Sequence, residues 1–88
     1  MNRSLTSADV RASHSSDGAV LIDVRQGIIF SLNVTGSRVW SELERGRNAE
    51  QIAHGLADAY GVPHEQALAD ILALIRQLED RHLVMSAP

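Results

Sequence analysis

The spacing of apolar residues changes at Asn33, and this change limits the possible folds more than any other feature of the sequence. Before Asn33 apolar residues tend to alternate with polar ones, as in β-strands, whereas after it they recur every three or four positions, as in helices. Short strands are predicted over residues 10–14, 20–24 and 28–32, with turn-forming residues 17–18 between the first two. The expected result is a three-stranded antiparallel sheet followed by helices.

Three helices are predicted after this point. Asn33 is a suitable N-cap for the first, and Asn48 and Gln51 have the spacing of a capping box at the start of the second. Pro63 suits the first position of the third and longest helix, which is expected to run to about Arg81. The sequence therefore predicts an α+β fold class.

One domain is expected, because 88 residues provide a single modest hydrophobic core. We place this domain over residues 10–85, with a flexible arm over residues 1–9 and a flexible tail over residues 86–88, because both ends are polar and lack periodicity. The absence of cysteine excludes disulfides and thiol chemistry and fits a reducing, cytoplasmic setting. Neither a signal peptide nor a membrane-spanning stretch is predicted.

No catalytic, metal or cofactor site is predicted. The four histidines are dispersed, and no pair combines metal-ligand spacing with a supporting carboxylate cluster. The glycines form neither a phosphate-binding loop nor a dinucleotide fingerprint, and no nucleophile motif is present. The sequence therefore favours a binding function over catalysis.

The distribution of charge disfavours binding to nucleic acid. The net charge of -3 opposes association with a phosphate backbone. A DNA-binding winged helix, which has a compatible order of elements, needs a basic outer face on its recognition helix. The third predicted helix instead carries four acidic residues and two basic ones, namely Glu65, Asp70, Glu79, Asp80, Arg76 and Arg81.

The third predicted strand lacks the features that normally protect a sheet edge. From Gln26 through Ser37 there is no charged residue and no proline. Natural proteins usually place charges, prolines or bulges on exposed edges to prevent unwanted pairing. Such an edge is either covered by the protein's own chain, paired with a second copy in a homodimer, or used to add a strand from a partner peptide. All three hypotheses remain open at this point.

The third predicted helix carries two adjacent apolar stripes, so that it either widens the core or lines a groove. If the helix lies beside the third strand, a peptide could pair with the backbone of residues 28–32 and insert alternate side chains against the helix. The first stripe comprises Leu68, Leu72 and Ile75, and the second comprises Ala67, Ile71, Leu74 and Leu78.

Several short patterns, taken in order, resemble the PqqD-like recognition elements of ribosomally synthesised and modified peptides. In the helical half of the chain, residues at three places fall where that family has equivalent residues, namely Gly46, the series Ile52, Leu56 and Tyr60, and the closing series Asp70, Leu74, Leu78 and Leu83-Val84. The resemblance extends over residues 10–84. Its N-terminal half consists of Val20-Leu21-Ile22-Asp23, Gly27-Ile28-Ile29-Phe30, Ser31-Leu32-Asn33, Thr35-Gly36 and Val39-Trp40.

This resemblance implies a winged-helix-like domain that binds the leader of a precursor peptide as an added strand, beside the third helix. Residues 27–33 are most similar to the discrete recognition proteins of lasso-peptide pathways, which implies a leader peptidase and an ATP-dependent cyclase as further partners. The alternative is a peptide chaperone of quinone-cofactor biosynthesis, although that branch usually has a Pro-Glu pair near this hairpin. A monomer without enzymatic activity is expected. The predicted peptide-binding residues are Ile28, Ile29, Phe30, Ser31, Leu32, Ala67, Asp70, Ile71, Leu74 and Leu78.

Overall fold

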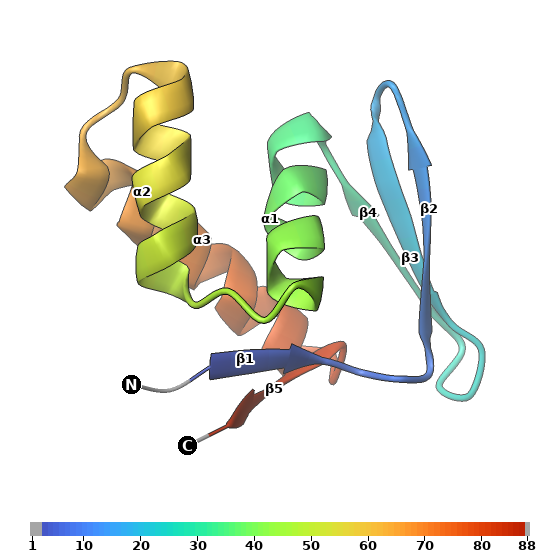
Figure 1. Ribbon diagram of the computed structural model, residues 1–88. Coiled ribbons are helices and arrows are strands. Elements are labelled where there is room, and N and C mark those ends of the chain that lie inside the picture. Colours follow the sequence, from blue (N-terminus) through green and yellow to red (C-terminus); the bar gives the residue numbers. More distant parts are fainter. Residues whose placement is uncertain (1–2, 88) are drawn as a thin grey trace.

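A computed structural model describes residues 3–87 and contains two small sheets and three helices (Figure 1). One sheet has three antiparallel strands in the order β2-β3-β4, and the other pairs β1 with β5. The predicted α+β architecture is confirmed. In chain order the elements are β1 (Arg3–Thr6), β2 (Val10–Ser15), β3 (Gly18–Asp23), β4 (Ile28–Leu32), α1 (Val34–Glu44), α2 (Ala49–Tyr60), α3 (His64–Asp80) and β5 (Val84–Ala87).

The three-stranded sheet buries one face against the helices. Leu21 lies opposite Phe30, and Ala19 lies opposite Leu32, so these residues share the inner face of the β3–β4 pair. Leu21, Ala19 and Leu32 are buried, whereas Ile22 on the outer face is exposed. This alternation is the period-two pattern expected for a sheet with one solvated face.

The tight turn before β3 requires glycine. Gly18 has a φ of +138°, and a Cβ atom there would collide with the carbonyl oxygen of Leu32. The β2–β3 hairpin is therefore packed directly against the C-terminal end of β4. A side chain at position 18 would displace the residues that connect β4 to α1.

The predicted starts of the first two helices are present with their capping bonds, whereas α3 begins at His64, with Pro63 at its N-cap and no side-chain capping bond. The Asn33 side chain accepts a hydrogen bond from the Gly36 N–H at 2.8 Å. Asn48 and Gln51 form a reciprocal capping box with bonds of 3.0 and 2.9 Å. Gly61 ends α2 in a left-handed conformation with a φ of 67°. These local bonds satisfy backbone groups that helix ends leave without partners.

The C-terminal end of α3 is a Schellman motif with histidine at its left-handed position. The Leu83 N–H donates to the Leu78 carbonyl, and the His82 N–H donates to the Glu79 carbonyl, both at 2.9 Å. His82 has a φ of 60°, a conformation that glycine usually occupies. Leu78 and Leu83 are both fully buried and supply the apolar contact typical of this motif. The turn sends the chain back towards β5.

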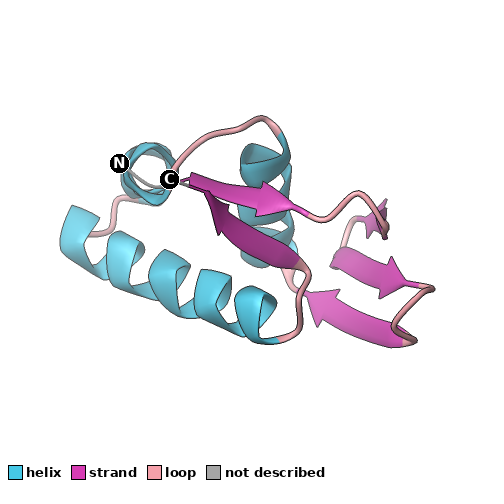
Figure 2. Ribbon diagram, turned by 90° about the horizontal axis from the view of Figure 1, so that it is seen from below, coloured by secondary structure: helices cyan, strands magenta, loops and turns pink. Residues whose placement is uncertain are grey.

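The structure differs from the sequence analysis at the two ends of the chain. Residues predicted to be a flexible arm form β1, and residues extending into the predicted tail form β5. The two strands pair antiparallel, with Leu5 opposite Met85, and bring the two termini side by side (Figures 1 and 2). Two segments of four residues carry too little periodicity to be recognised singly, and their pairing depends on a long-range contact. Residues 1–2 and 88 of the predicted arm and tail lie outside the described residues.

Aliphatic residues and one tryptophan form the core. Trp40 is 1% exposed and belongs to the core together with Val39 and Leu43. The largest fully buried side chains are those of Trp40, Leu21, Leu43, Leu78, Leu83, Val39 and Asp23.

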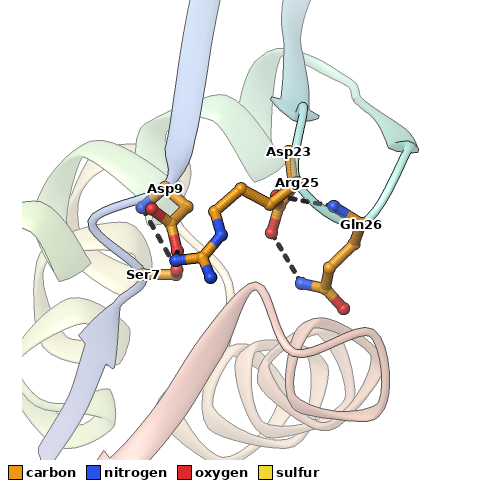
Figure 3. A network of polar contacts seen from close by, with 5 residues as sticks. All are labelled: Ser7, Asp9, Asp23, Arg25 and Gln26. Atoms are coloured by element: carbon orange, nitrogen blue, oxygen red, sulfur yellow. Dashed lines mark hydrogen bonds and ion pairs between the residues drawn. The ribbon is translucent and has the colours of Figure 1, made fainter.

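Asp23 is a buried carboxylate that organises the turn before β4 (Figure 3). It accepts hydrogen bonds from the Gln26 side chain at 2.6 Å and from the Gln26 backbone N–H at 3.1 Å. The bond from the Gln26 side chain is the main cause that holds the pKa of Asp23 below its ordinary value. Beside it, Arg25 forms an exposed ion pair with Asp9 at 3.3 Å. The turn therefore sets where β4 begins.

Candidate functional site

The outer edge of β4 is free. In the sheet order β2-β3-β4, β4 pairs only with β3, and no strand within residues 3–87 covers its other side. Ile29 is 68% exposed, and Ser31 is also exposed. The part of the chain that the structure describes thus leaves open the edge that the sequence analysis singled out.

The register shows which backbone groups this edge offers. The two-residue turn before β3 makes Gly18 part of a hydrogen-bonded pair with β2, and such pairs alternate along an antiparallel ladder. Ala19 therefore bonds to β4, where Leu32 lies opposite it. By the same alternation, the N–H and C=O groups of Ile29 and Ser31 point away from β3. Four backbone groups are available to an added strand.

The remaining predicted residues of β4 face inward. Ile28 and Phe30 are half-buried against the core, and Leu32 is 7% exposed. Their side chains support the strand from behind. An added strand would meet the backbone of β4 and the exposed side chains of Ile29 and Ser31.

The structure distributes the predicted residues of α3 between core and surface. Ala67, Ile71 and Leu78 are buried together with Ile75, so the core face of α3 draws on both predicted stripes. Leu78 is 0% exposed and belongs to the core. In contrast, Leu74 is half-buried, and Asp70 is exposed. These two residues flank the core face of α3.

A cavity of about 420 Å³ lies where the N-terminus of α1, the C-terminus of α2 and the first half of α3 meet. Asn33, which directly follows β4, lines this cavity, so the free edge leads to its rim. The cavity brings together four of the predicted residues, whereas Leu78 and the five predicted residues of β4 do not line it. Its lining consists of Asn33, Thr35, Gly36, Val39, Leu56, Tyr60, Val62, Gln66, Ala67, Asp70, Ile71 and Leu74.

The sequence profile of coenzyme PQQ synthesis protein D, the PqqD family, matches residues 18–84. The chain belongs to the PqqD family. The matched region includes β3, β4 and all three helices, and therefore both the free edge and the cavity. No curated protein matches this PqqD-family chain with significant similarity.

Two solved structures are similar to this PqqD-family chain over most of its length. The structure of TbiB1 in complex with the TbiA(beta) leader peptide is 31% identical with a TM-score of 0.85, covering 91% of this chain and 93% of that chain. The structure of lasso peptide synthetase B1 complexed with the leader peptide is 25% identical with a TM-score of 0.85, covering 94% of this chain and 98% of that chain. The fold is therefore shared over nearly the whole length of each protein.

Sequence reasoning missed part of the lining of the cavity in this PqqD-family chain. Tyr60, which the predicted peptide-binding residues do not include, is 49% exposed at the cavity, and the Arg38 guanidinium lies 5.8 Å from its ring centre. Val62 lies in the connection after α2, where no helical periodicity could indicate its direction. For a tyrosine in the last turn of a helix, the helical periodicity does not determine whether the side chain is buried, because the segment that follows the helix determines what covers it.

Arg81 is a second residue that the site prediction did not include. Its guanidinium carbon lies 5.1 Å from the centre of the Phe30 ring, within the range of a cation–π contact. Since Arg81 caps α3 and Phe30 lies in the middle of β4, this contact joins the two walls of the predicted cleft. The contact spans 51 positions of sequence, so no local pattern could reveal it.

The described residues offer little for metal chemistry. No group of three or more histidine, aspartate or glutamate side chains within residues 3–87 could hold a metal ion. His54 and His64 do meet edge to face with ring centres 5.5 Å apart, and Glu50 lies 3.6 Å from the His64 Nε2 atom. Also within the described residues, no helix is both long and apolar enough to span a bilayer.

Proposed function

We propose that this chain binds the leader region of a ribosomally synthesised precursor peptide by adding it as a strand to the free edge of β4. The observation that carries this proposal is the open edge at Ile29 and Ser31, which leads through Asn33 to the rim of a mainly apolar cavity. Both similar solved structures contain a leader peptide, which supports the same kind of ligand for this chain. Strand addition is an established mode of peptide recognition.

The free edge and the cavity have different roles in this mechanism. The four free backbone groups of Ile29 and Ser31 form hydrogen bonds worth roughly 1 kcal/mol each with any peptide sequence. The cavity accepts apolar side chains, each contributing about 1.5–3 kcal/mol when fully buried. Association costs at least about 4 kcal/mol, so micromolar affinity requires three or more apolar anchors. Backbone pairing supplies affinity, and the cavity supplies selectivity.

We further propose that the domain is a monomer that performs no chemistry itself. It acts in the cytoplasm, where its precursor peptide is made, and presents the bound peptide to a leader peptidase and an ATP-dependent cyclase of a lasso-peptide pathway. Holding the leader raises the effective concentration of the rest of the peptide near those enzymes. Sedimentation of the free protein distinguishes this monomer from a homodimer that pairs two β4 edges, because the dimer would occupy the edge that the peptide needs.

A second candidate pathway is coenzyme PQQ synthesis, because the matching family profile bears that description. There the chain would act as a chaperone for a different precursor peptide through the same edge and cavity. The two pathways differ in the peptide, and therefore in which leader binds. Titration with one lasso-type leader and one PQQ precursor peptide separates them.

The test of peptide binding is an NMR titration of ¹⁵N-labelled protein with the leader of the precursor peptide encoded beside its gene. We expect the amide protons of Ile29 and Ser31 to shift and to become protected from hydrogen exchange, with further shifts at Tyr60 and Leu74 around the cavity. A scrambled leader of equal composition is the control. If the leader binds without protecting Ile29 and Ser31, strand addition is wrong, and if no shifts occur, leader binding is wrong.

A further inference from the structure

One stripe on α3 carries opposite charges at its two ends. Asp70, Leu74, Gln77 and Arg81 follow one another at intervals of four, three and four positions, which places them on one side of a helix. This stripe lies beside the buried core face of α3. Its residues are exposed except for Leu74, which is half-buried. A peptide that binds at the border between the core face and the surface of α3 would therefore contact this stripe.

In the part of the chain that the structure describes, the two charges of this stripe have no partner of opposite charge. Within residues 3–87 neither Asp70 nor Arg81 takes part in an ion pair. By contrast, Arg45 and Arg47 both lie against Glu42. The stripe thus presents an available carboxylate at one end and an available guanidinium at the other.

Contacts with other elements place these charges along β4. Asp70 lines the cavity together with Asn33, which follows the last residue of β4. Arg81 lies over Phe30 in the middle of β4. The direction from Asp70 to Arg81 along α3 is therefore opposite to the direction of β4.

The Phe30 ring prepares Arg81 for a charged ligand. A guanidinium stacked on an aromatic ring keeps its N–H donors free at the edge of its plane, and these donors fit a carboxylate in a two-point contact. Stacking also limits the rotamers of the arginine, so less conformational entropy is lost when a ligand binds. The site at Arg81 is thus suited to an acidic side chain, and Asp70 is suited to a basic one.

The spacing of the two charges defines a pattern in the ligand. Eleven positions separate Asp70 from Arg81, which corresponds to roughly 16 Å along a helix. An extended strand covers that distance in about five residues, and because side chains on one face of a strand lie an even number of positions apart, two ligand residues that both face α3 are separated by roughly four or six positions. All strand pairs of this fold are antiparallel, and an added strand that continues this pattern runs from Asp70 towards Arg81.

We propose that Asp70 and Arg81 select leader peptides in which a basic residue precedes an acidic residue by roughly four or six positions. This inference rests on the proposed strand addition and deepens it, because it specifies the charge order and the direction of the bound peptide. The apolar anchor for the cavity lies near the basic residue, since Asp70 is part of the cavity lining. Each exposed charge pair is expected to change affinity by up to about fivefold.

Selection from a phage-displayed library of random 12-residue peptides tests the proposal without knowledge of the natural ligand. The intact protein is used as bait in three forms, which are the wild type, the double variant Asp70→Arg with Arg81→Asp, and the control Arg76→Glu. Arg76 is exposed and lies on the opposite side of α3 from the stripe. Circular dichroism confirms that all three proteins are folded before selection.

We expect the wild type and the Arg76→Glu variant to enrich peptides with a basic residue roughly four or six positions before an acidic one. The double variant is expected to enrich the reverse charge order. Peptides enriched without any charge order, or with the same order on the double variant, would overturn the charge proposal while leaving strand addition intact. Failure to enrich any peptide on the wild type would instead count against peptide binding itself and against the charge proposal with it.

Discussion

The Arg81 guanidinium carbon lies 5.1 Å from the centre of the Phe30 ring, which connects the end of α3 with the middle of β4. The Schellman turn at His82 and Leu83 directly follows Arg81 and returns the chain towards β5. The pairing of β5 with β1 then holds the N-terminal and C-terminal strands together (Figure 2). The C-terminal end of α3 is therefore held next to β4 by the contact of Arg81 with Phe30 and by the turn that follows it. A peptide at the free edge of β4 would find this wall already in place.

The first prediction concerns the backbone of the edge. Ile29→Pro removes an N–H group that points away from β3, and proline is tolerated on a strand edge that faces solvent. We expect the variant to keep its fold but to bind leader peptide at least about tenfold more weakly, because one hydrogen bond is lost and the ring obstructs pairing. Anisotropy of a fluorescent leader measures the change. Ile29→Thr keeps the N–H group and the branched side chain and should bind normally, and equal affinity for the proline variant would rule out edge capture.

The second prediction separates the groove side of α3 from its solvent side. Leu74 lines the cavity and is half-buried, whereas Leu72 is 50% exposed and does not line it. Leu74→Asp should weaken leader binding by about tenfold or more, because a buried apolar contact is replaced by a charge, with a nearly unchanged circular dichroism spectrum. Leu72→Asp carries the same change and should bind as the wild type does. Equal losses in both variants would mean that the effect is not local to the cavity.

The third prediction concerns Leu78, which was predicted to contact the peptide and which the structure places at 0% exposure. Leu78→Ala should lower the free energy of unfolding by about 2–5 kcal/mol, because it leaves a cavity in the core. Urea denaturation followed by the fluorescence of Trp40 measures this loss. A variant of unchanged stability that no longer binds leader peptide would show instead that Leu78 acts in the groove.

The fourth prediction concerns the left-handed residue after α3. His82 has a φ of 60°, which costs a residue with a Cβ about 1 kcal/mol relative to glycine. His82→Gly should therefore raise the free energy of unfolding by up to about 1 kcal/mol. His82→Ala keeps the Cβ atom and should bring no gain. Stabilisation by alanine equal to that by glycine would show that removal of the imidazole, and not relief of the backbone, is responsible.

The fifth prediction concerns pH and the turn before β4. Hydrogen bonds from Gln26 favour the ionised form of Asp23 and lower its pKa in the folded state below the ordinary value of 3.8. The carboxylate therefore stabilises the fold at neutral pH, and this contribution is lost as the pH falls below about 3.8 towards the lowered pKa. Asp23→Asn should be less stable than the wild type at pH 7, with a difference that shrinks in acid. Urea denaturation at several pH values measures the difference in unfolding free energy between the two proteins. A difference that does not change with pH would contradict this role of the carboxylate.

Local sequence signals were sufficient for the order of elements from β2 to α3, because the interactions that carry them lie within a few residues. The bond from Gly36 to the Asn33 side chain and the reciprocal bonds of Asn48 and Gln51 each span three positions. The change from period two to period 3.6 likewise reports the direction of each side chain relative to its own strand or helix. The free edge was also predicted from local sequence, because it was recognised by the absence of charged residues and proline from Gln26 through Ser37.

The extent of the site depended on contacts between distant segments. Leu74 and Leu78 stand four positions apart and look equivalent in sequence, yet only the packing of α3 against its neighbours makes one a cavity wall and the other part of the core. The joining of β1 to β5, the cavity among three helices and the contact of Arg81 with Phe30 have the same origin.

The sequence by itself thus determined strands β2 to β4, the three helices, the N-caps of the first two helices and the unprotected edge, because alternation and capping are properties of neighbouring residues. Only the tertiary structure decided which side chains face the edge and which face the core, because burial is a property of what packs against a residue from elsewhere in the chain.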